Sequence, residues 1–318
     1  MTSVDTIARS EYRTLAQRCG LLDRSERGKL ALTGTQAKAF LQGQVSNDVE
    51  ALQPGQGCYA AFLTPKGKML GDLRVLDTGD ELLLDTERSA LQGVFDALRH
   101  GLVGFDAELH KRTLQRGLLS LIGPHSRALA GAPDLPREEH ANAPGSIDGV
   151  EVVLVATDLG VDVICPAEEA ERVRRALVAA GASPASEADA DVLRVESGRP
   201  RFGVDLDDTT IPQEGGLNER AVSFTKGCYP GQETVARLFY KGKPNRRLCG
   251  LRLSERVAAG APLLLGERTV GTLTSSADSP LFGPIGLALV RREAELGAEL
   301  AVGADGVTAV VVELPFAA

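Results

Sequence analysis

The sequence predicts an α+β fold with two similarly built halves, antiparallel sheets and a small β-barrel at the C-terminal end. Three observations lead to this class. A strand–turn–strand–helix pattern occurs twice, its strands are joined by hairpin-length turns, and short apolar runs replace helices after residue 247. Hairpin connections favour antiparallel sheets with helices packed on one face. A doubly wound nucleotide fold is not indicated, because neither a Gly-x-Gly-x-x-Gly nor a Walker loop occurs.

The first copy of the repeated pattern lies between residues 70 and 98. Leu70 to Leu76 alternates as a strand does, residues 77–80 predict a turn, and Glu81 to Leu84 returns as a second strand. A helix is expected from about Glu87 to Leu98, because its apolar residues recur at helical spacing. This copy predicts one half of the α+β region.

The second copy begins at residue 150. Val150 to Ala156 reads as a strand, residues 157–160 as a turn, and Val161 to Cys165 as the returning strand. A helix is expected from about Ala167 to Ala180, and Gly181 is a suitable stop. The same order of elements predicts a second half of similar build.

Composition also suggests how the chain is divided. Residues 131–149 are rich in Pro, Ala, Gly and Asp, which predicts an internal loop between the halves. A similar stretch, Ala182 to Asp191, precedes a short expected strand from Val192 to Glu196. We expect two α+β subdomains in residues 1–243 and a barrel in residues 244–318. The apolar runs that predict its strands are 248–253, 262–265, 270–274, 285–290, 300–302 and 307–314.

The composition is that of an ordinary globular protein, with 43% hydrophobic and 25% charged residues. No run approaches the ~20 apolar residues of a membrane helix, and residues 1–18 contain no signal-peptide core. The five cysteines stand singly, so a disulfide scaffold and local Cys-x-x-Cys metal motifs are not expected. We therefore expect a protein of the reducing cytoplasm with no resident metal and no membrane contact.

The net charge of −8 makes nucleic acid unlikely as a general ligand, because nonspecific binding needs a basic footprint. One local exception is the acid-free segment from Arg237 to Arg247, which holds five basic residues. It is either a solvated charged face or a local basic patch.

The motif with the richest chemistry is an eight-residue run: Lys226, Gly227, Cys228, Tyr229, Pro230, Gly231, Gln232 and Glu233. Cys228 lies just before an expected helix, Glu233 to Tyr240, and two residues from Lys226. Both features stabilise a thiolate, and the glycines permit a sharp turn or a close approach. The alternative is that Cys228 is a small buried hydrophobe.

The order of several segments resembles the folate-binding YgfZ family, which is related to the aminomethyltransferase (T-protein) of the glycine cleavage system. The resemblance covers nearly the whole chain, and the Lys226–Glu233 run resembles the family signature K-G-C-[FY]-x-G-Q-E. The other segments that carry it are residues 20–23, 40–49, 65–69, 122–124, 194–198, 200–205 and 271–276.

This resemblance implies three domains around a central folate-binding cleft, with tetrahydrofolate or a one-carbon derivative as the ligand. It also implies iron–sulfur enzymes or their assembly factors as protein partners, and an indirect role in tRNA modification. Whether the protein catalyses a reaction is left open.

The resemblance also assigns roles to single residues. Glu196 matches the pterin-binding glutamate of the T-proteins, and a carboxylate can accept two neighbouring N–H groups of a pterin. Asp72 matches one of two adjacent aspartates in the family, where this chain has Gly71 before it. The alternatives are a surface glutamate beside Arg194 and a capping aspartate in a hairpin.

Three further residues receive roles in the same way. Asn47 falls in a loop that lines the family's cleft, although Asn-Asp is equally natural in a turn. Arg237 is expected to attract the anionic glutamate tail of folate. Cys228 is either a nucleophile or redox-sensitive thiolate, or part of a loop that Lys226 and Gln232 support at the cleft edge.

Three functions compete at this point. The first is a tetrahydrofolate-binding accessory protein for iron–sulfur enzymes. The second is a folate-dependent enzyme that transfers an aminomethyl or formyl group; the missing second aspartate and the cysteine motif count against it. The third is an RNA-modifying enzyme, which the basic segment supports and the acidic balance opposes.

Overall fold

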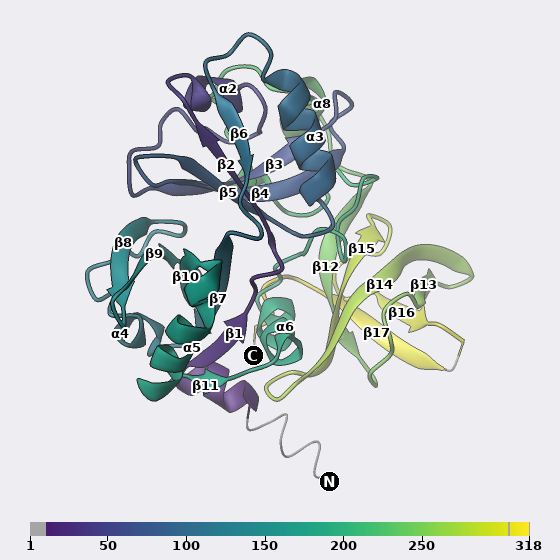
Figure 1. Cartoon of the computed structure of the whole chain (residues 1–318). Coiled ribbons are helices and arrows are strands. Elements are labelled where there is room, and N and C mark those ends of the chain that lie inside the picture. The colour runs from purple at the N-terminus through teal and green to yellow at the C-terminus, as the bar shows by residue number, and fades with distance from the viewer. Residues whose placement is uncertain (1–10, 305, 318) are drawn as a thin grey trace.

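The computed structural model describes residues 11–304 and 306–317. Figure 1 shows three bodies around a common centre: a five-stranded sheet domain at the top, a six-stranded sheet domain at lower left and a barrel at lower right. The predicted fold class, α+β domains with antiparallel sheets and a C-terminal barrel, is confirmed.

The upper domain is an antiparallel sheet in the order β3-β4-β5-β2-β6. Helices α2 and α3 cover one face, where α3 buries Val94 and Leu98 against the sheet. The helix expected from Glu87 begins four residues later, since residues 88–90 form a turn. The elements are β2 (Gly28–Thr33), α2 (Ala37–Gln42), β3 (Gly57–Leu63), β4 (Met69–Asp77), β5 (Leu82–Thr86), α3 (Leu91–Gly101) and β6 (Glu108–Lys111).

The lower-left domain is a six-stranded sheet in the order β11-β1-β7-β10-β9-β8. Strand β1 precedes the upper domain in the chain, and its sheet neighbour β7 follows that domain. The upper domain is therefore an insertion between β1 and β7. The elements are β1 (Gly20–Asp23), β7 (Arg116–Ile122), α4 (Ser126–Leu129), β8 (Asn142–Ile147), β9 (Val150–Ala156), β10 (Gly160–Pro166), η1 (Ala167–Glu169), α5 (Ala170–Ala179) and β11 (Ser183–Pro184).

Two sequence-based expectations are wrong in this region. The strand expected at Val192–Glu196 is the end of helix α6 (Glu187–Glu196), which begins with a capping box between Ser186 and Asp189. The loop expected over residues 131–149 contains strand β8. Among the described residues this strand pairs with β9 alone, so Pro144 lies at a sheet edge, where a residue without an N–H group is tolerated.

The C-terminal barrel closes in the order β12-β15-β14-β13-β16-β17. Each of the six apolar runs seen in the sequence falls on a strand of this barrel, although the last run extends two residues beyond its strand. Buried residues alternate along β17, because every second side chain points into the barrel core. The strands are β12 (Arg246–Leu253), β13 (Pro262–Leu265), β14 (Arg268–Ser279), β15 (Gly283–Arg291), β16 (Glu299–Val302) and β17 (Val307–Val312).

Apolar contacts fix the three bodies to one another. The two sheets meet face to face, for example through Leu83 of β5 and Ile164 of β10. Helix α6 joins the barrel, where Val195 packs with Ile285. The segment carrying α7 (Asn218–Ala221) and α8 (Gln232–Lys241) packs against β3 and β4 of the upper sheet.

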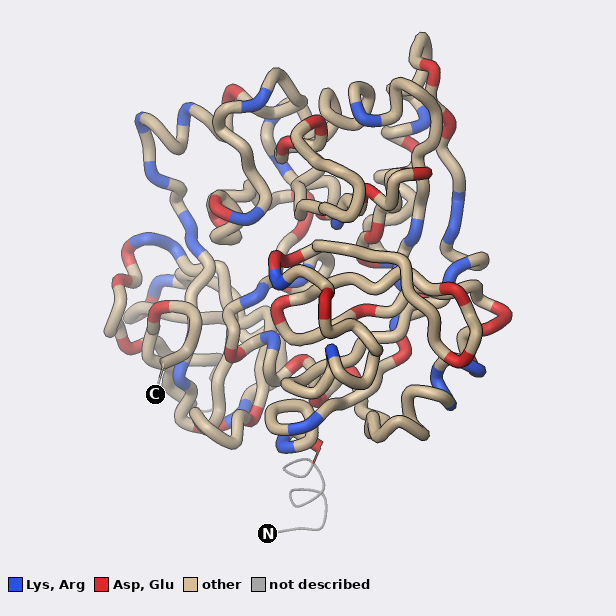
Figure 2. The backbone as a smooth tube through the Cα atoms, turned by 90° about the vertical axis from the view of Figure 1, so that its left-hand side faces the viewer, with Lys and Arg blue, Asp and Glu red and all other residues tan. Residues whose placement is uncertain are grey.

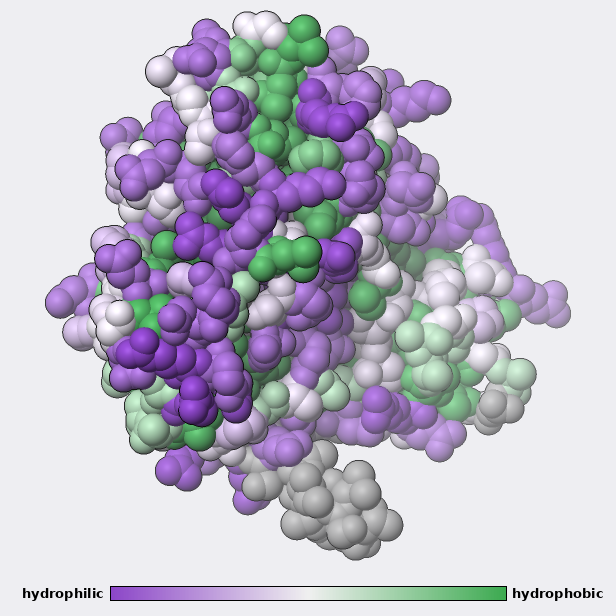
Figure 3. Space-filling model, viewed as in Figure 1, coloured by the Kyte–Doolittle hydropathy of each residue, from purple (hydrophilic) through white to green (hydrophobic). Residues whose placement is uncertain are grey.

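Lys and Arg residues and Asp and Glu residues are distributed over all three bodies in the described part of the chain (Figure 2). Hydrophilic residues dominate the face seen in Figure 3, where hydrophobic residues form a band on the upper domain and smaller patches on the other two bodies. No helix in residues 11–304 or 306–317 is long and apolar enough to cross a membrane.

Candidate functional site

Two adjoining cavities lie where the three bodies meet. The larger, about 670 Å³, is bounded by the barrel and the end of α6, and the smaller, about 200 Å³, is bounded by the upper sheet. The larger has the size of a small-molecule site, whereas the smaller is lined by four buried ionisable residues, namely Asp72, His140, Asp162 and Arg194. The two share the lining residues Asp158, Leu159, Arg199, Pro200 and Arg220.

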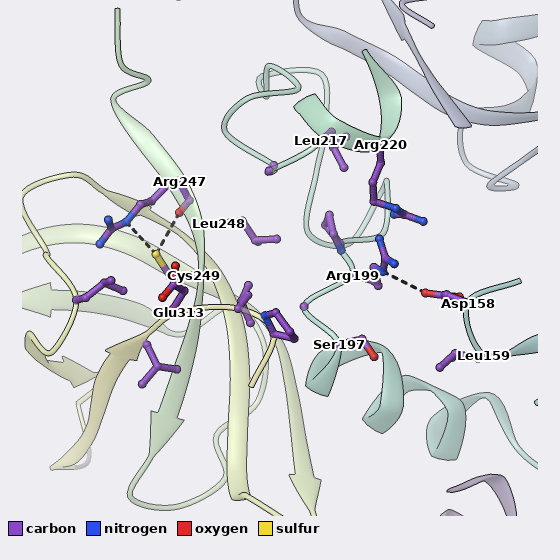
Figure 4. A pocket seen from close by; sticks show the side chains of 18 residues that line it. Asp158, Leu159, Ser197, Arg199, Leu217, Arg220, Arg247, Leu248, Cys249 and Glu313 are labelled. Atoms are coloured by element: carbon purple, nitrogen blue, oxygen red, sulfur yellow. Dashed lines mark hydrogen bonds and ion pairs between the residues drawn. The ribbon is translucent and has the colours of Figure 1, made fainter. Parts of the chain in front are cut away.

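Figure 4 shows the larger cavity between barrel strands on one side and α6 with the α7 segment on the other. Arg199 forms an ion pair with Asp158 at 3.1 Å across its wall. On the barrel side, Arg247 Nε donates to Cys249 Sγ at 3.2 Å, and burial raises the pKa of that thiol. Polar side chains are therefore interspersed with apolar ones in the wall of this cavity.

Asp72 lines the smaller cavity from the middle of β4. Its side chain is buried, and the hydroxyl of Tyr59 donates a 2.6 Å hydrogen bond to Oδ2. Burial is the main cause that raises the pKa of Asp72 to about 6, while Tyr59 and Arg27 oppose the rise. A carboxyl group with this pKa can exchange a proton near neutral pH.

Side chains of successive residues in a strand point to opposite faces of the sheet. A side chain at position 71, where this chain has glycine, would therefore lie on the face opposite Asp72. A side chain at position 71 would meet Ala90 at 2.9 Å and Val94 at 3.0 Å under helix α3. A second carboxylate there would therefore be buried against a helix, and its absence removes no charge from the cavity.

A network of ion pairs lies beside Asp72 in the cavity wall. Arg27 and Arg74 both bind the fully buried Asp85, at 2.9 Å and 2.6 Å. The two guanidinium groups offset the burial of Asp85 and hold its pKa well below the usual range. Arg74 also reaches Asp162 at 2.6 Å, which links the upper sheet to the lower one across the cavity.

The facing wall consists of residues that the sequence reading did not select. Arg220 forms an ion pair with Glu139, and its guanidinium carbon lies 5.1 Å from the ring centre of Tyr59. The ring centre of His140 is 6.4 Å from that of Tyr59. Tyr59, the Glu139–His140 pair and Arg220 are far apart in the chain, and their local sequence carries no motif that indicates a shared site.

Glu196 does not line either cavity, although its neighbours Ser197 and Gly198 line the larger one. It ends helix α6, and its two oxygens accept hydrogen bonds from the hydroxyls of Tyr12 and Ser279. Burial raises the pKa of Glu196, and these two hydrogen bonds oppose the rise. The residue thus joins the N-terminal segment, α6 and the barrel.

Asn47 and Lys226 support the cavity wall from behind. The amide of Asn47 donates to the main-chain oxygens of Tyr59 at 2.8 Å and Arg220 at 3.1 Å. The buried ammonium of Lys226 donates to the main-chain oxygens of Val45 at 2.6 Å and Asn47 at 3.1 Å, and also to Gln42. Burial lowers the pKa of Lys226 to about 8.

The rest of the Lys226–Glu233 run follows the upper sheet away from the cavity. Tyr229 is buried with Leu63 and Met69, and Gly231 begins α8 at a φ of 83°. Cys228 is exposed, and no hydrogen bond to its thiol occurs in the described part of the chain. The predicted helix after the motif is confirmed as α8.

The structure therefore brings only some of the predicted site residues together. Asp72 lines the cavity, and Asn47 and Lys226 support its wall. Cys228 and Arg237 are exposed outside both cavities. Among residues 11–304 and 306–317, no group of three or more His, Cys, Asp or Glu side chains is arranged to hold a metal ion.

Comparisons with known proteins agree with this architecture. A model of the GCVT N-terminal domain matches residues 2–226, and a model of the glycine cleavage T-protein C-terminal barrel domain matches residues 246–317. An aminomethyltransferase of Rubrobacter xylanophilus is 31% identical, over 97% of this chain and 86% of that protein. A putative chloroplastic transferase of Arabidopsis thaliana is 29% identical, over 94% and 71%.

The same arrangement is found in a solved structure. The crystal structure of the glycine cleavage system aminomethyltransferase T from Bartonella henselae superposes with a TM-score of 0.87. It is 24% identical in sequence, and the match covers 98% of this chain and 89% of that one. This likeness concerns the fold.

Proposed function

Because the chain belongs to the glycine cleavage T-protein family, we propose that it binds tetrahydrofolate or a one-carbon derivative in the two adjoining cavities, together called the central cavity. In this cavity it acts as a folate-dependent one-carbon transferase. The aminomethyltransferases of this family use tetrahydrofolate as the one-carbon acceptor. The observation that carries the proposal is Asp72, buried at the cavity wall and held by Tyr59.

The residues of the cavity fit a folate. The smaller cavity is lined by Tyr59, whose ring can stack on a flat heterocycle, and by polar side chains that include Asp72. The larger cavity adjoins it and has room for the rest of an extended ligand. Bound tetrahydrofolate would supply the ring nitrogens that take up the one-carbon unit.

Asp72 would hold or release a proton at Oδ1 beside these nitrogens, because Oδ2 already accepts from the Tyr59 hydroxyl. Its pKa of about 6 lets both forms exist near neutral pH, and the Tyr59 hydroxyl keeps the carboxyl group in one orientation. Asn47 would act indirectly, since its amide fixes the main chain of Tyr59 and Arg220.

Glu196 remains a proposed pterin ligand on the grounds of its position in the family pattern. Its side chain is buried, accepts hydrogen bonds from the hydroxyls of Tyr12 and Ser279, and lines neither cavity, so binding a pterin would require the surrounding side chains to move. Glu196→Gln offers one acceptor instead of two and should weaken tetrahydrofolate binding severely. An unchanged Kd would remove Glu196 from the site.

The transferase proposal is tested with an aminomethylated carrier protein and tetrahydrofolate. We expect the wild type to release methylenetetrahydrofolate, and Asp72→Asn to lose at least about a hundredfold in rate, the lower range for a lost acid–base group. Cys228→Ala is the matched control, because its thiol lies outside the cavities. Folate binding without any transfer by the wild type would contradict the enzyme proposal.

A second candidate function is a tetrahydrofolate-binding accessory protein for iron–sulfur enzymes. The exposed thiol of Cys228 favours it, because an exposed thiol outside the cavities is available to a protein partner. In cells lacking the protein, Cys228→Ala should then fail to restore iron–sulfur enzyme activity while its folate affinity stays unchanged. Full restoration would exclude an essential role for the thiol.

A further inference from the structure

The residues that line both cavities mark the junction between them. Across this junction, Nε of Arg199 lies 3.1 Å from Oδ2 of Asp158 (Figure 4). Asp158 belongs to the lower sheet domain, whereas Arg199 follows α6, so the ion pair links two walls from different parts of the fold. In the described part of the chain, no other ion pair has both of its partners in both cavities.

The main chain on each side of the junction is held in place. Asp158 lies in the turn between β9 and β10, where the N–H of Thr157 donates to the carbonyl of Gly160 at 3.0 Å. The main-chain N–H of Arg199 donates to the carbonyl of Arg194 at 3.1 Å, and its carbonyl accepts from the Arg194 guanidinium at 2.7 Å. The two side chains can therefore separate by rotation while the main chain stays fixed.

The ion pair is weakly held. Each of its side chains is 32% exposed, and within residues 11–304 and 306–317 the guanidinium of Arg199 makes no other ion pair or hydrogen bond. Arg74 and Asp162, which also link two walls of the smaller cavity, are 12% and 7% exposed. A solvent-accessible ion pair changes an equilibrium by a factor of roughly five or less, and salt screens it. A ligand can therefore break it at small cost.

We propose that the Arg199–Asp158 ion pair is a gate between the two cavities, closed without a ligand and parted by any ligand that spans both. The inference rests on the proposed function, because the extended folate assigned to the central cavity is such a ligand. A compound confined to one cavity leaves the gate closed. The gate thus controls how fast long ligands enter, and it responds to their length rather than to a particular ligand atom.

The test compares two ligands by stopped-flow binding under reducing conditions. 5-Formyltetrahydrofolate carries the ring system, the benzoyl group and the glutamate tail, whereas 6-methyltetrahydropterin carries the ring system alone. Arg199→Gln removes the cation of the gate, and Asp158→Asn removes the anion. Both variants should raise the association rate constant of the long ligand by about three- to fivefold, because neither has an ion pair to break. For the short ligand, the rate constant should stay within about twofold of the wild type.

Arg172→Gln is the matched control. Nε of Arg172 lies 2.9 Å from Oδ2 of Asp148, so the same atoms form an ion pair in the same domain, and neither residue lines a cavity. This variant should bind both ligands at the wild-type rates. A chain that combines Asp158→Arg with Arg199→Asp restores an ion pair and should associate as slowly as the wild type.

Salt provides a second readout that a merely structural role would not give. About 0.5 M NaCl screens the ion pair, so the difference between wild type and Arg199→Gln for the long ligand should largely disappear. A difference that persists in high salt would contradict the gate.

The outcomes separate the gate from the proposed function. If the wild type does not bind 5-formyltetrahydrofolate, the proposed function fails and the gate fails with it. If the two single variants shift its association in opposite directions, the pair acts only by attracting or repelling the anionic ligand; the gate is then wrong and the proposed function stands. Unchanged rates in both variants, or an equal acceleration of the short ligand, also overturn the gate alone.

Discussion

At the scale of single residues, burial at the cavity wall shifts the pKa values of the ionisable side chains that line it. Asp72 has a pKa of about 6 in the folded protein, against about 3.9 in an unfolded chain. Because folding raises the pKa, the neutral carboxyl group stabilises the folded state relative to the ionised one. This contribution to the free energy of unfolding is fully present below pH 4 and is lost as the pH rises through 6. Keeping the ionised carboxylate in the fold at pH 8 therefore costs about 3 kcal/mol.

Asp72→Asn should consequently unfold less readily at pH 8, by up to about 3 kcal/mol, because an amide has no charge to bury and still accepts from Tyr59. The gain should shrink toward zero as the pH falls to 4. Urea unfolding of both proteins at the two pH values measures it. A variant that is less stable than the wild type at pH 8 would contradict the assigned cause.

The five cysteines should differ sharply in reactivity. Cys228 is exposed, whereas Cys19, Cys165 and Cys249 are buried and Cys58 is half-buried. Burial raises the pKa of Cys19 and Cys165 to about 11 and of Cys58 to about 12. One thiol should therefore react with iodoacetamide in the folded protein at pH 7.5, and Cys228→Ser should remove it. Rapid labelling of two sites in the wild type would rule this out.

At the scale of elements, the start of α8 depends on a close approach of two backbones. A Cβ at Gly231 would lie 2.6 Å from the main-chain oxygen of Thr64 and 2.7 Å from Cα of Gly67. Its φ of 83° adds strain for any other residue. Two segments of the family pattern, residues 65–69 and 226–233, thus meet at paired glycines.

Gly231→Ala should therefore destabilise the fold by about 2–4 kcal/mol, through strain and displacement of the 64–68 turn. Gly227→Ala is the matched control from the same run, since a Cβ there meets nothing within 4 Å. It should change the free energy of unfolding by less than about 0.5 kcal/mol. Denaturant midpoints compare the two, and equal effects would contradict the role of the close approach.

The elements that the sequence predicted well are those whose pattern is local. The hairpin strands and barrel strands alternate over short runs, and α8 follows a glycine break. Helix α6 differs from the expected strand because Leu193–Glu196 alternates between apolar and charged residues, although the Ser186–Asp189 capping box is a usable helix signal. Strand β8 was missed because its Pro and Gly content is typical of loops.

The site was predictable only where a family pattern named a residue. Asp72, which the family pattern names, lines the smaller cavity, whereas Tyr59, His140 and Arg220 line it from segments distant in sequence. Their contact depends on how the upper sheet, the lower sheet and the α7 segment pack, and no sequence spacing records that packing. The same limit explains why exposed Arg237 was assigned to the ligand although it lies outside both cavities.

At the scale of the whole molecule, the cavity belongs to no single domain. Its walls include Asp72 from the upper sheet, Asp162 from the lower sheet and Cys249 from the barrel. A ligand that fills it contacts all three bodies, and binding to the folded state alone stabilises a protein by RT ln(1 + [L]/Kd). At a ligand concentration of a hundred times Kd, the free energy of unfolding rises by about 2.7 kcal/mol. This stabilisation is shared across the domain junctions.

Saturating 5-formyltetrahydrofolate should therefore slow amide hydrogen exchange in all three bodies at once, in β4, β10 and β12. The physical reason is that opening any one domain junction releases the ligand. Free glutamate at the same concentration is the control for the anionic tail and should protect none of them. Protection confined to the upper domain would mean that folate binds to that domain alone, and the central cavity would then not be the binding site.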